Sequence, residues 1–166
     1  MRVGIGYDSH RFVADRPLIL GGVEIPYDMG LDGWSDADAV AHALTDAILG
    51  AAGLGDIGQM FPSDDPRFQN ADSLELLRRA SMKAAEARCS LMHADITVIC
   101  ERPKIGPYAD EMRERLAQAA LAGYSNISIK AKTNEGMGFI GRGEGVAVIA
   151  VVLMDEAETA RKSRSG

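Results

Sequence analysis

Residues 145–154 read GVAVIAVVLM, an apolar stretch without a charged residue and rich in β-branched side chains. The run is too short to span a bilayer, and it predicts a β-strand that is covered on both faces. Such a strand fits a sheet that carries helices on one face and other subunits on the second. The stretch therefore predicts a strand inside the sheet and a second sheet face that other subunits cover.

Sequence patterns in the residues before 145 predict the other helices and strands. Alternation of apolar residues at 3–7 predicts a first strand. Ser35 and Asp38 resemble a capping box before a helix at 39–52, which Gly53 would end. The remaining expected elements are a short β region at 18–25, a loop at 56–66, a helix at 73–88, a strand at 95–100, a helix from 107 to 123 and a strand from 127.

The order of these elements, β-β-α-α-β-α-β-β, predicts the fold class. We expect an α+β fold with a mixed β-sheet and helices on one face. No internal repeat and no linker-like shift in composition divides the chain. We therefore expect a single domain over residues 1–166, in which about 155–166 form a polar C-terminal tail.

The composition narrows the classes of function. The 166 residues include 18 basic and 24 acidic side chains, and a formal net charge of −6 argues against a general nucleic-acid binder. Two cysteines do not suggest a disulfide framework, and the N-terminus shows no signal peptide, so we expect a cytoplasmic protein with no membrane partner. If such a chain binds an anionic small molecule, metal ions, backbone N–H groups or a few placed cations must offset the repulsion.

Asp8, His10 and His42 form a candidate metal site. Asp8 and His10 lie two residues apart at a strand end, so their side chains share a face with Cα atoms about 6–7 Å apart. With His42 on the helix at 39–52 they supply three ligands for zinc and leave a fourth position open, as a catalytic ion requires. Asp38 or Asp46, one turn to either side, could orient the His42 imidazole. From spacing alone, a surface His10 and a satisfied helix His42 remain an alternative.

Three further segments carry chemical groups. The loop at 56–66 is either a substrate lid with hydroxyl-binding carboxylates or ordinary turn chemistry. KAKTNEG at 130–136 places a cation, a hydroxyl and a carboxylate together, which can grip a phosphate directly and through a divalent ion on Glu135. GRGEG at 141–145 is either a backbone anion nest beside a guanidinium or a glycine bulge before a central strand.

Four motifs together carry a family resemblance. They are D-x-H at 8–10, SDAD-x-x-x-HALTDAILGAAGLGDIGQ-x-FP at 35–62, ERPKI at 101–105 and KTNEG-x-GFIGRGEG at 132–145. Over about residues 1–154 the chain resembles the 2-C-methyl-D-erythritol 2,4-cyclodiphosphate synthases. The resemblance implies a chorismate-mutase-like fold, assembled as a homotrimer with active sites between adjacent subunits. It also implies conversion of 4-diphosphocytidyl-2-C-methyl-D-erythritol 2-phosphate to the cyclic diphosphate and CMP, in non-mevalonate isoprenoid biosynthesis.

The resemblance implies roles for individual residues. Asp8, His10 and His42 would bind Zn²⁺, Glu135 would hold Mg²⁺ or Mn²⁺ against the diphosphate, and Thr133 would contact the phosphate in the transition state. The residues expected to bind substrate are Asp8, Ser9, His10, Trp34, Ser35, Asp56, Ile57, Gly58, Phe61, Pro62, Ser63, Asp64, Asp65, Cys100, Glu101, Arg102, Pro103, Lys104, Ile105, Gly106, Lys132, Thr133, Asn134, Glu135, Phe139 and Arg142.

Most of these substrate residues fall into three groups by the part of the site that the resemblance gives them. Residues 56–58 and 61–65 would hold the methylerythritol part, and 100–106 with 132–135 would line the cytidine pocket. Phe139 and Arg142 would lie near the substrate or near a central trimer cavity, where an isoprenoid diphosphate could bind.

The implied chemistry agrees with an acidic chain. The 2-phosphate of the substrate itself attacks the β-phosphorus, so no protein nucleophile is needed. Two metal ions offset the repulsion between the two anions, and intramolecular attack supplies much of the rest through positioning.

Trp34 departs from the family pattern, which usually has a histidine that donates to a phosphate at this place. An indole N–H donates one hydrogen bond but carries no charge. We expect Trp34 to be a tolerated substitute whose N–H fills the same place. The alternative is a catalytically weakened trimeric module that binds isoprenoid diphosphates in a central cavity. A zinc hydrolase is disfavoured because the chain lacks a general-base motif such as HExxH.

Overall fold

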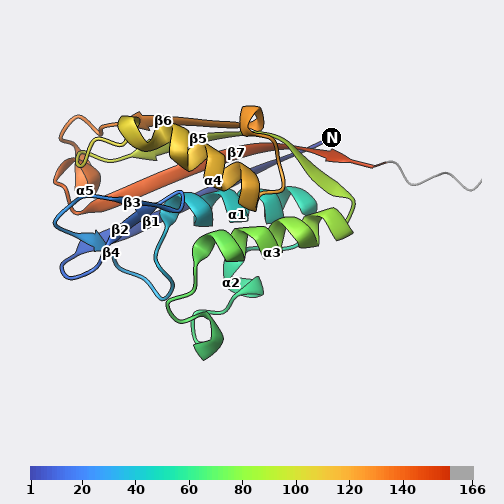
Figure 1. Ribbon diagram of the computed structural model, residues 1–166, viewed down its shortest axis with the longest axis horizontal. Coiled ribbons are helices and arrows are strands. Elements are labelled where there is room, and N and C mark those ends of the chain that lie inside the picture. The colour runs from blue at the N-terminus through green and yellow to red at the C-terminus, as the bar shows by residue number, and fades with distance from the viewer. Residues whose placement is uncertain (158–166) are drawn as a thin grey trace, which may run out of the picture.

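The computed structural model describes residues 1–157 and has an α+β architecture. The strands are β1 (Arg2–Val13), β2 (Leu18–Leu20), β3 (Val23–Ile25), β4 (Gly30–Leu31), β5 (Cys89–Ile99), β6 (Ile127–Lys132) and β7 (Gly145–Glu156), and the α-helices are α1 (Ala39–Ala52), α2 (Ile57–Met60), α3 (Ser73–Glu86), α4 (Ala109–Ala119) and α5 (Gly138–Gly141). A five-stranded sheet has the order β4-β1-β7-β5-β6. Helices α1, α3 and α4 lie along one face of it (Figure 1).

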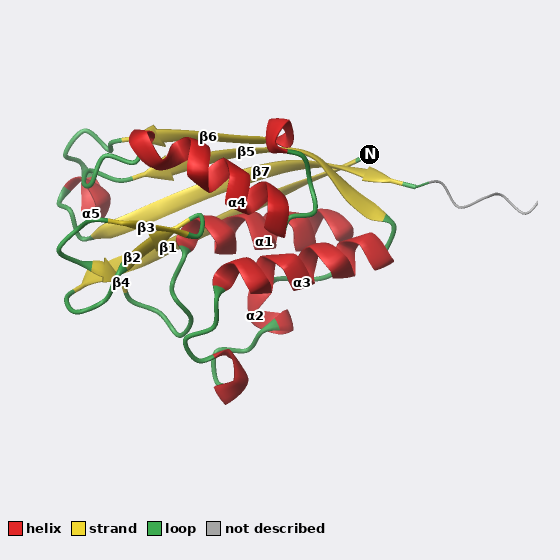
Figure 2. Ribbon diagram, in the orientation of Figure 1, coloured by secondary structure: helices red, strands yellow, loops and turns green. Residues whose placement is uncertain are grey.

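The sheet is mixed, as the sequence predicts. The β5–β6 pair is parallel, whereas β1 pairs with β4 and β7, and β5 with β7, in the antiparallel sense. Figure 2 shows the helices on the same side of the strands, with the β2–β3 hairpin beside them. None of the helices in residues 1–157 is long and apolar enough to cross a membrane.

Helix α1 packs against β1 at close range because two glycines of the strand face it. A Cβ atom added at Gly4 would come within 2.0 Å of the Ala47 carbonyl oxygen, and one at Gly6 within 1.9 Å of the Ala43 oxygen. Side chains alternate along a strand, so the residues that follow Gly6 on this face are Asp8 and His10. The tight contact therefore brings these two polar side chains up against the first turns of α1.

Asp38, and not Ser35, begins α1, which corrects the expected capping box. One Asp38 carboxylate oxygen accepts the backbone N–H groups of Val40 and Ala41 at 3.0 and 3.1 Å. The same carboxylate accepts Gly21 N–H at 2.8 Å and Gly22 N–H at 2.6 Å, at the turn between β2 and β3. This buried side chain thus caps the helix and ties the hairpin to it.

The other differences from the sequence prediction concern the ends of elements and three short elements, β4, α2 and α5, that the sequence did not predict. The helix expected at 39–52 has these bounds, but the loop at 56–66 contains α2, the 18–25 region is a complete hairpin, and β5 begins earlier than residue 95. Asp155 and Glu156 belong to β7, where they pair with Ser90 and Cys89. Positions 158–166 of the expected tail lie outside the described residues.

The face of the sheet opposite the helices carries exposed apolar side chains. On β1, Val3 is 70% exposed, Ile5 69% and Tyr7 55%, and on β7 the partner of Ile5, Val151, is 42% exposed. The predicted cover over both faces of 145–154 is thus present only on the helix side of a single chain. A contiguous apolar sheet face of this kind marks an interaction surface.

Candidate active site

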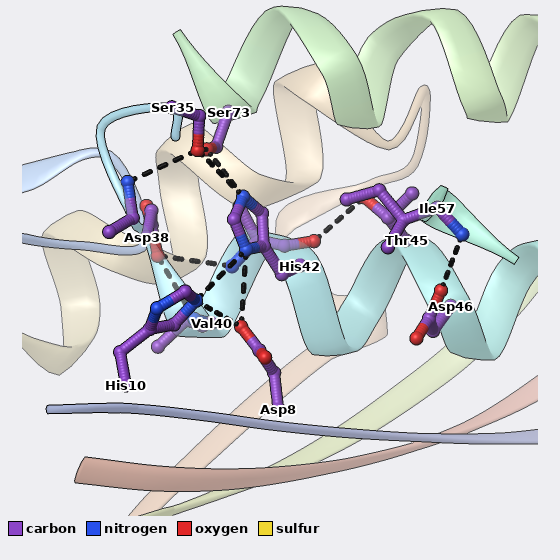
Figure 3. Close-up of polar contacts among 12 residues, drawn as sticks. Asp8, His10, Ser35, Asp38, Val40, His42, Thr45, Asp46, Ile57 and Ser73 are labelled. Carbon is purple, nitrogen blue, oxygen red and sulfur yellow. Dashed lines mark hydrogen bonds and ion pairs between the residues drawn. The ribbon is translucent and has the colours of Figure 1, made fainter. Parts of the chain in front are cut away.

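Asp8, His10 and His42 converge on one point between β1 and α1 (Figure 3). Asp8 Oδ2 lies 2.8 Å from His10 Nε2 and 3.1 Å from His42 Nδ1. The two histidine nitrogens are 3.3 Å apart. Tetrahedral bonds of about 2.0–2.1 Å place ligand atoms about 3.3 Å from one another, so the three atoms match one face of a metal tetrahedron. The spacing prediction of a shared metal site is therefore supported by the geometry, and the surface-residue alternative is not.

The electrostatics of this triad favour a bound cation. Burial would raise the pKa of Asp8, but hydrogen bonds from His10 and His42 outweigh it, and the pKa of this carboxyl lies well below its usual range. Burial would lower the pKa of His10, yet the hydrogen bond and charge of Asp8 raise it. Asp8 is consequently held as an anion, the form that ligates a metal, whereas a metal that binds must displace the proton that Asp8 stabilises on His10.

Both imidazole rings are oriented by hydrogen bonds on the side away from the triad. His10 Nδ1 donates to the Asp32 carbonyl oxygen at 2.6 Å, which leaves Nε2 facing the metal position. His42 Nε2 lies 2.9 Å from Ser73 Oγ and 3.1 Å from Ser35 Oγ, which leaves Nδ1 facing that position. Ser73 Oγ in turn donates to the Asp36 carboxylate. These contacts select the tautomers that metal binding requires.

Neither Asp38 nor Asp46 orients His42, although the sequence suggested both. Asp38 is occupied by the backbone of α1 and of the hairpin. Asp46 Oδ1 accepts the N–H of Ile57 at 2.7 Å and so fixes the start of α2. The partners of His42 Nε2 are Ser35, which lies in a sequence motif, and Ser73, the first residue of α3, which has no signal in the motifs.

Ser73→Ala tests the hydrogen bond between Ser73 Oγ and His42 Nε2. The variant is expected to weaken binding of Zn²⁺ about 10- to 100-fold, because the imidazole loses a partner that fixes its tautomer and angle. Affinity is measured by competition with a chromophoric chelator. Ser81→Ala is the matched control, since Ser81 lies buried on the same helix and its Oγ has no hydrogen-bond partner among the described residues. Equal affinities in the two variants would contradict the role of Ser73.

A cavity of about 600 Å³ opens beside the triad. Its lining contains the metal-ligand candidate His42 and nine of the residues that the resemblance assigned to substrate: His10, Trp34, Ser35, Ile57, Gly58, Phe61, Pro62, Ser63 and Asp64. Phe68 and Leu76 also line it and were not predicted. The walls combine aromatic and aliphatic groups with a few polar ones, as small-molecule sites do.

Two expected carboxylates have other partners. Asp56 caps α2 by accepting Gln59 N–H at 2.8 Å. Asp65 pairs with Arg67 at 2.5 Å, and its backbone carbonyl accepts the indole N–H of Trp34 at 3.3 Å. The indole N–H, which the sequence analysis assigned to a phosphate, is therefore engaged with the loop after α2.

The second group of expected residues gathers where β5 and β6 end. The Cys100 N–H donates to the Lys132 carbonyl oxygen at 2.9 Å. Glu101 Oε1 accepts the Asn134 N–H at 2.7 Å, and Thr133 Oγ1 donates to Glu135 Oε1 at 2.9 Å. Burial raises the pKa of the Cys100 thiol to about 11, so it is no nucleophile at neutral pH. The segments 100–106 and 132–135 thus form one cluster, as expected.

Among the described residues, no hydrogen bond or ion pair joins this cluster to the metal triad. The triad extends from β1, whereas Thr133 and Glu135 follow β6, three strands away in the order β1-β7-β5-β6. At about 4.8 Å per strand the two elements are about 14 Å apart. Phe139 lines a cavity of about 250 Å³ together with Ser9 and His10, and Arg142 pairs with Glu144 at 2.6 Å. Within a single chain, the two groups of expected residues therefore extend from strands that are not neighbours.

These features define a class of protein. It is an α+β enzyme with a site for a divalent metal at the mouth of a small-molecule cavity. Residues 1–155 match the YgbB family, and the chain belongs to that family.

Curated relatives confirm the resemblance over nearly the whole chain. The 2-C-methyl-D-erythritol 2,4-cyclodiphosphate synthase of Symbiobacterium thermophilum is 56% identical over 154 residues, which is 93% of this chain and 98% of that protein. The synthase of the same name from Moorella thermoacetica is 53% identical and covers 95% of this chain and 97% of its own length.

Solved structures agree with the fold. The bifunctional IspDF protein of Campylobacter jejuni superposes with a TM-score of 0.90 at 44% identity, over 95% of this chain and 42% of that longer chain. A 2-C-methyl-D-erythritol 2,4-cyclodiphosphate synthase in a CDP-bound form superposes with a TM-score of 0.83 at 42% identity, over 93% of this chain and all of that one.

Proposed function

We propose that this chain converts 4-diphosphocytidyl-2-C-methyl-D-erythritol 2-phosphate to 2-C-methyl-D-erythritol 2,4-cyclodiphosphate and CMP. The observation that carries the proposal is the Asp8–His10–His42 triad, which opens on a cavity lined by the residues expected to hold the methylerythritol part. The names of the relatives, which match over almost the full length, support the same activity.

The donor set fits zinc in particular. Two imidazole nitrogens and one carboxylate oxygen are common zinc ligands, and three protein ligands leave a position for substrate. A bound zinc ion would supply Lewis-acid stabilisation of negative charge on the diphosphate. We propose that Glu135 holds a second ion, Mg²⁺ or Mn²⁺, and that Thr133 contacts the phosphate.

The residues of the chain position the substrate more than they react with it. The cavity wall of Ile57, Phe61 and Phe68 excludes water around the methylerythritol part, while Ser63 and Asp64 offer hydrogen bonds to its hydroxyl groups. The 2-phosphate is ionised at neutral pH and attacks within the same molecule. Orientation of the two phosphates therefore supplies much of the rate.

We further propose a homotrimer with active sites between adjacent subunits. The exposed apolar sheet face formed by Val3, Ile5, Tyr7 and Val151 needs a partner surface. The separation of Glu135 from the triad within one chain also calls for a second subunit, because one diphosphate must reach both. An isoprenoid diphosphate near Phe139 and Arg142 in such a trimer stays a prediction.

The weakened binding module is not favoured. The residues of the metal triad are present and converge, and the relatives at about half identity carry the name of the synthase. Trp34 is the one departure, and its indole N–H has a partner in the loop beside the cavity. Its presence accordingly gives no ground for a separate function.

CMP release from the diphosphocytidyl substrate tests the proposal. At fixed magnesium, we expect turnover that a zinc chelator abolishes and added Zn²⁺ restores, because the triad holds the ion that stabilises charge on the diphosphate. Products are resolved by anion-exchange chromatography. Absence of CMP, with zinc content and oligomeric state verified, would contradict the proposed function.

A further inference from the structure

The segment 33–36 is a rigid strap beside the cavity. The guanidinium of Arg16 donates to the carbonyl oxygens of Gly33 at 2.7 Å and Ser35 at 2.6 Å, on both sides of Trp34. Asp36 N–H donates to the Ala71 carbonyl oxygen at 3.1 Å. The Asp36 carboxylate accepts the backbone N–H of Ser73 at 3.1 Å. Trp34 is thus presented from a fixed backbone.

The segment 61–69, here named the cavity loop, contributes five residues to the cavity wall and projects from the body of the protein (Figure 1). Most of its polar contacts are internal, such as the pair between Asp65 and Arg67. Its Phe61 and Phe68 rings meet edge to face at 5.3 Å. Such a loop has a defined shape of its own but needs an attachment to stay over the cavity.

Trp34 supplies that attachment. Its indole N–H donates to the Asp65 carbonyl oxygen at the centre of the loop, at 3.3 Å. Its own carbonyl oxygen accepts the Asn70 N–H at 2.8 Å, at the end of the loop. Among the described residues, Trp34 is the only side chain from outside the loop that hydrogen bonds to residues 62–68. The ring, 40% exposed, also lines the cavity.

We propose that Trp34 is a positioning residue that latches the cavity loop over the substrate cavity. The latch holds Ser63 and Asp64 where they meet the hydroxyl groups of a polyol phosphate, a role that rests on the proposed function. Trp34 then acts on substrate through the loop and does not donate its N–H to a phosphate. Trp34 therefore affects the affinity for substrate and not the affinity for metal.

The loop itself provides a test that needs no substrate. Arg67 is exposed, with its side chain 79% accessible, and it precedes Phe68, so trypsin can cut between them once the loop leaves its place. Trp34→Phe keeps a ring but removes the N–H. We expect cleavage after Arg67 to become about fivefold faster, the factor that corresponds to loss of one ordinary hydrogen bond. The rate is followed by mass spectrometry of the resulting fragments.

Tyr124→Phe is the matched control for this cleavage. It removes one aromatic donor, since the Tyr124 hydroxyl donates to Asp110 at 3.0 Å, at a place remote from the loop. Cleavage after Arg67 should match wild type in this control. Unchanged cleavage in Trp34→Phe as well would overturn the latch.

Kinetics then test whether the latch serves substrate. In Trp34→Phe we expect KM for the diphosphocytidyl substrate to rise about fivefold while kcat and zinc content stay as in wild type. Faster cleavage with an unchanged KM in an active enzyme would overturn the positioning role. Faster cleavage in a protein whose wild type shows no turnover would leave the latch standing and refute the proposed function instead.

Discussion

His42→Ala is expected to abolish stoichiometric zinc binding and to lower kcat/KM by about a thousandfold or more. His42 supplies one of three protein ligands, and its Nδ1 lies within 3.3 Å of both other ligand atoms. Charge stabilisation by a bound metal is worth several kcal/mol at a reacting phosphate, and each 1.36 kcal/mol is a factor of ten in rate. Zinc per chain is measured by atomic emission and activity by CMP release.

His93→Ala is the control for this variant. His93 is exposed on β5, outside the triad, so its loss removes a histidine without removing a ligand. We expect one zinc per chain and wild-type turnover. If His42→Ala kept both zinc and activity while remaining folded, the metal would have to bind elsewhere, and the triad would lose its assigned role.

Spacing in the sequence made the triad a candidate, and the family resemblance, not the spacing, selected it over the alternative. Alternation along β1 puts Asp8 and His10 on the face that bears Gly4 and Gly6, and those glycines let α1 come close enough for His42 to reach them. The bounds of α1 at 39–52 were predicted correctly because Gly53 ends an apolar run, although the residue that caps its first turn is Asp38 and not Ser35. Local sequence patterns were sufficient here because the ends of this helix depend on neighbouring residues.

The surroundings of the triad could not be predicted in the same way. Ser73 reaches His42 across 31 residues of chain, and its place depends on how α3 packs beside α1. Phe68, from the loop between α2 and α3, and Leu76, from α3 itself, also line the cavity. Such contacts depend on the path of a loop, for which neither periodicity nor spacing carries a signal.

The resemblance implies an active site between subunits, and the sheet order supplies a physical reason for one. Glu135 lies some ninety residues after His42 in sequence, and the resemblance alone assigns both to one active site. The strand order places β7 and β5 between β1 and β6, so the segment that carries Glu135 leaves the sheet three strands away from the one that bears Asp8 and His10. A site shared between subunits requires that the triad of one subunit acts together with Glu135 of its neighbour.

Co-expression of two inactive variants tests whether the site is shared between subunits. His42→Ala lacks a working triad, and Glu135→Gln lacks the carboxylate that is proposed to hold the second metal. Glutamine preserves the shape of the side chain at a position where the backbone has φ +51, so the substitution disturbs the loop little. Each homotrimer alone should be inactive. Different affinity tags on the two chains allow purification of mixed trimers only.

Mixed trimers are expected to recover about one third of wild-type activity. In a closed ring of three subunits with two kinds of chain, one interface alone brings the intact triad of a Glu135→Gln chain to the intact Glu135 of a His42→Ala chain. Pairing His42→Ala with His10→Ala is the control and should recover nothing, since both changes damage the same half of the site. Mixed trimers without activity would place both halves within one chain, and the diphosphate would then have to span about 14 Å, three strand spacings, to contact them.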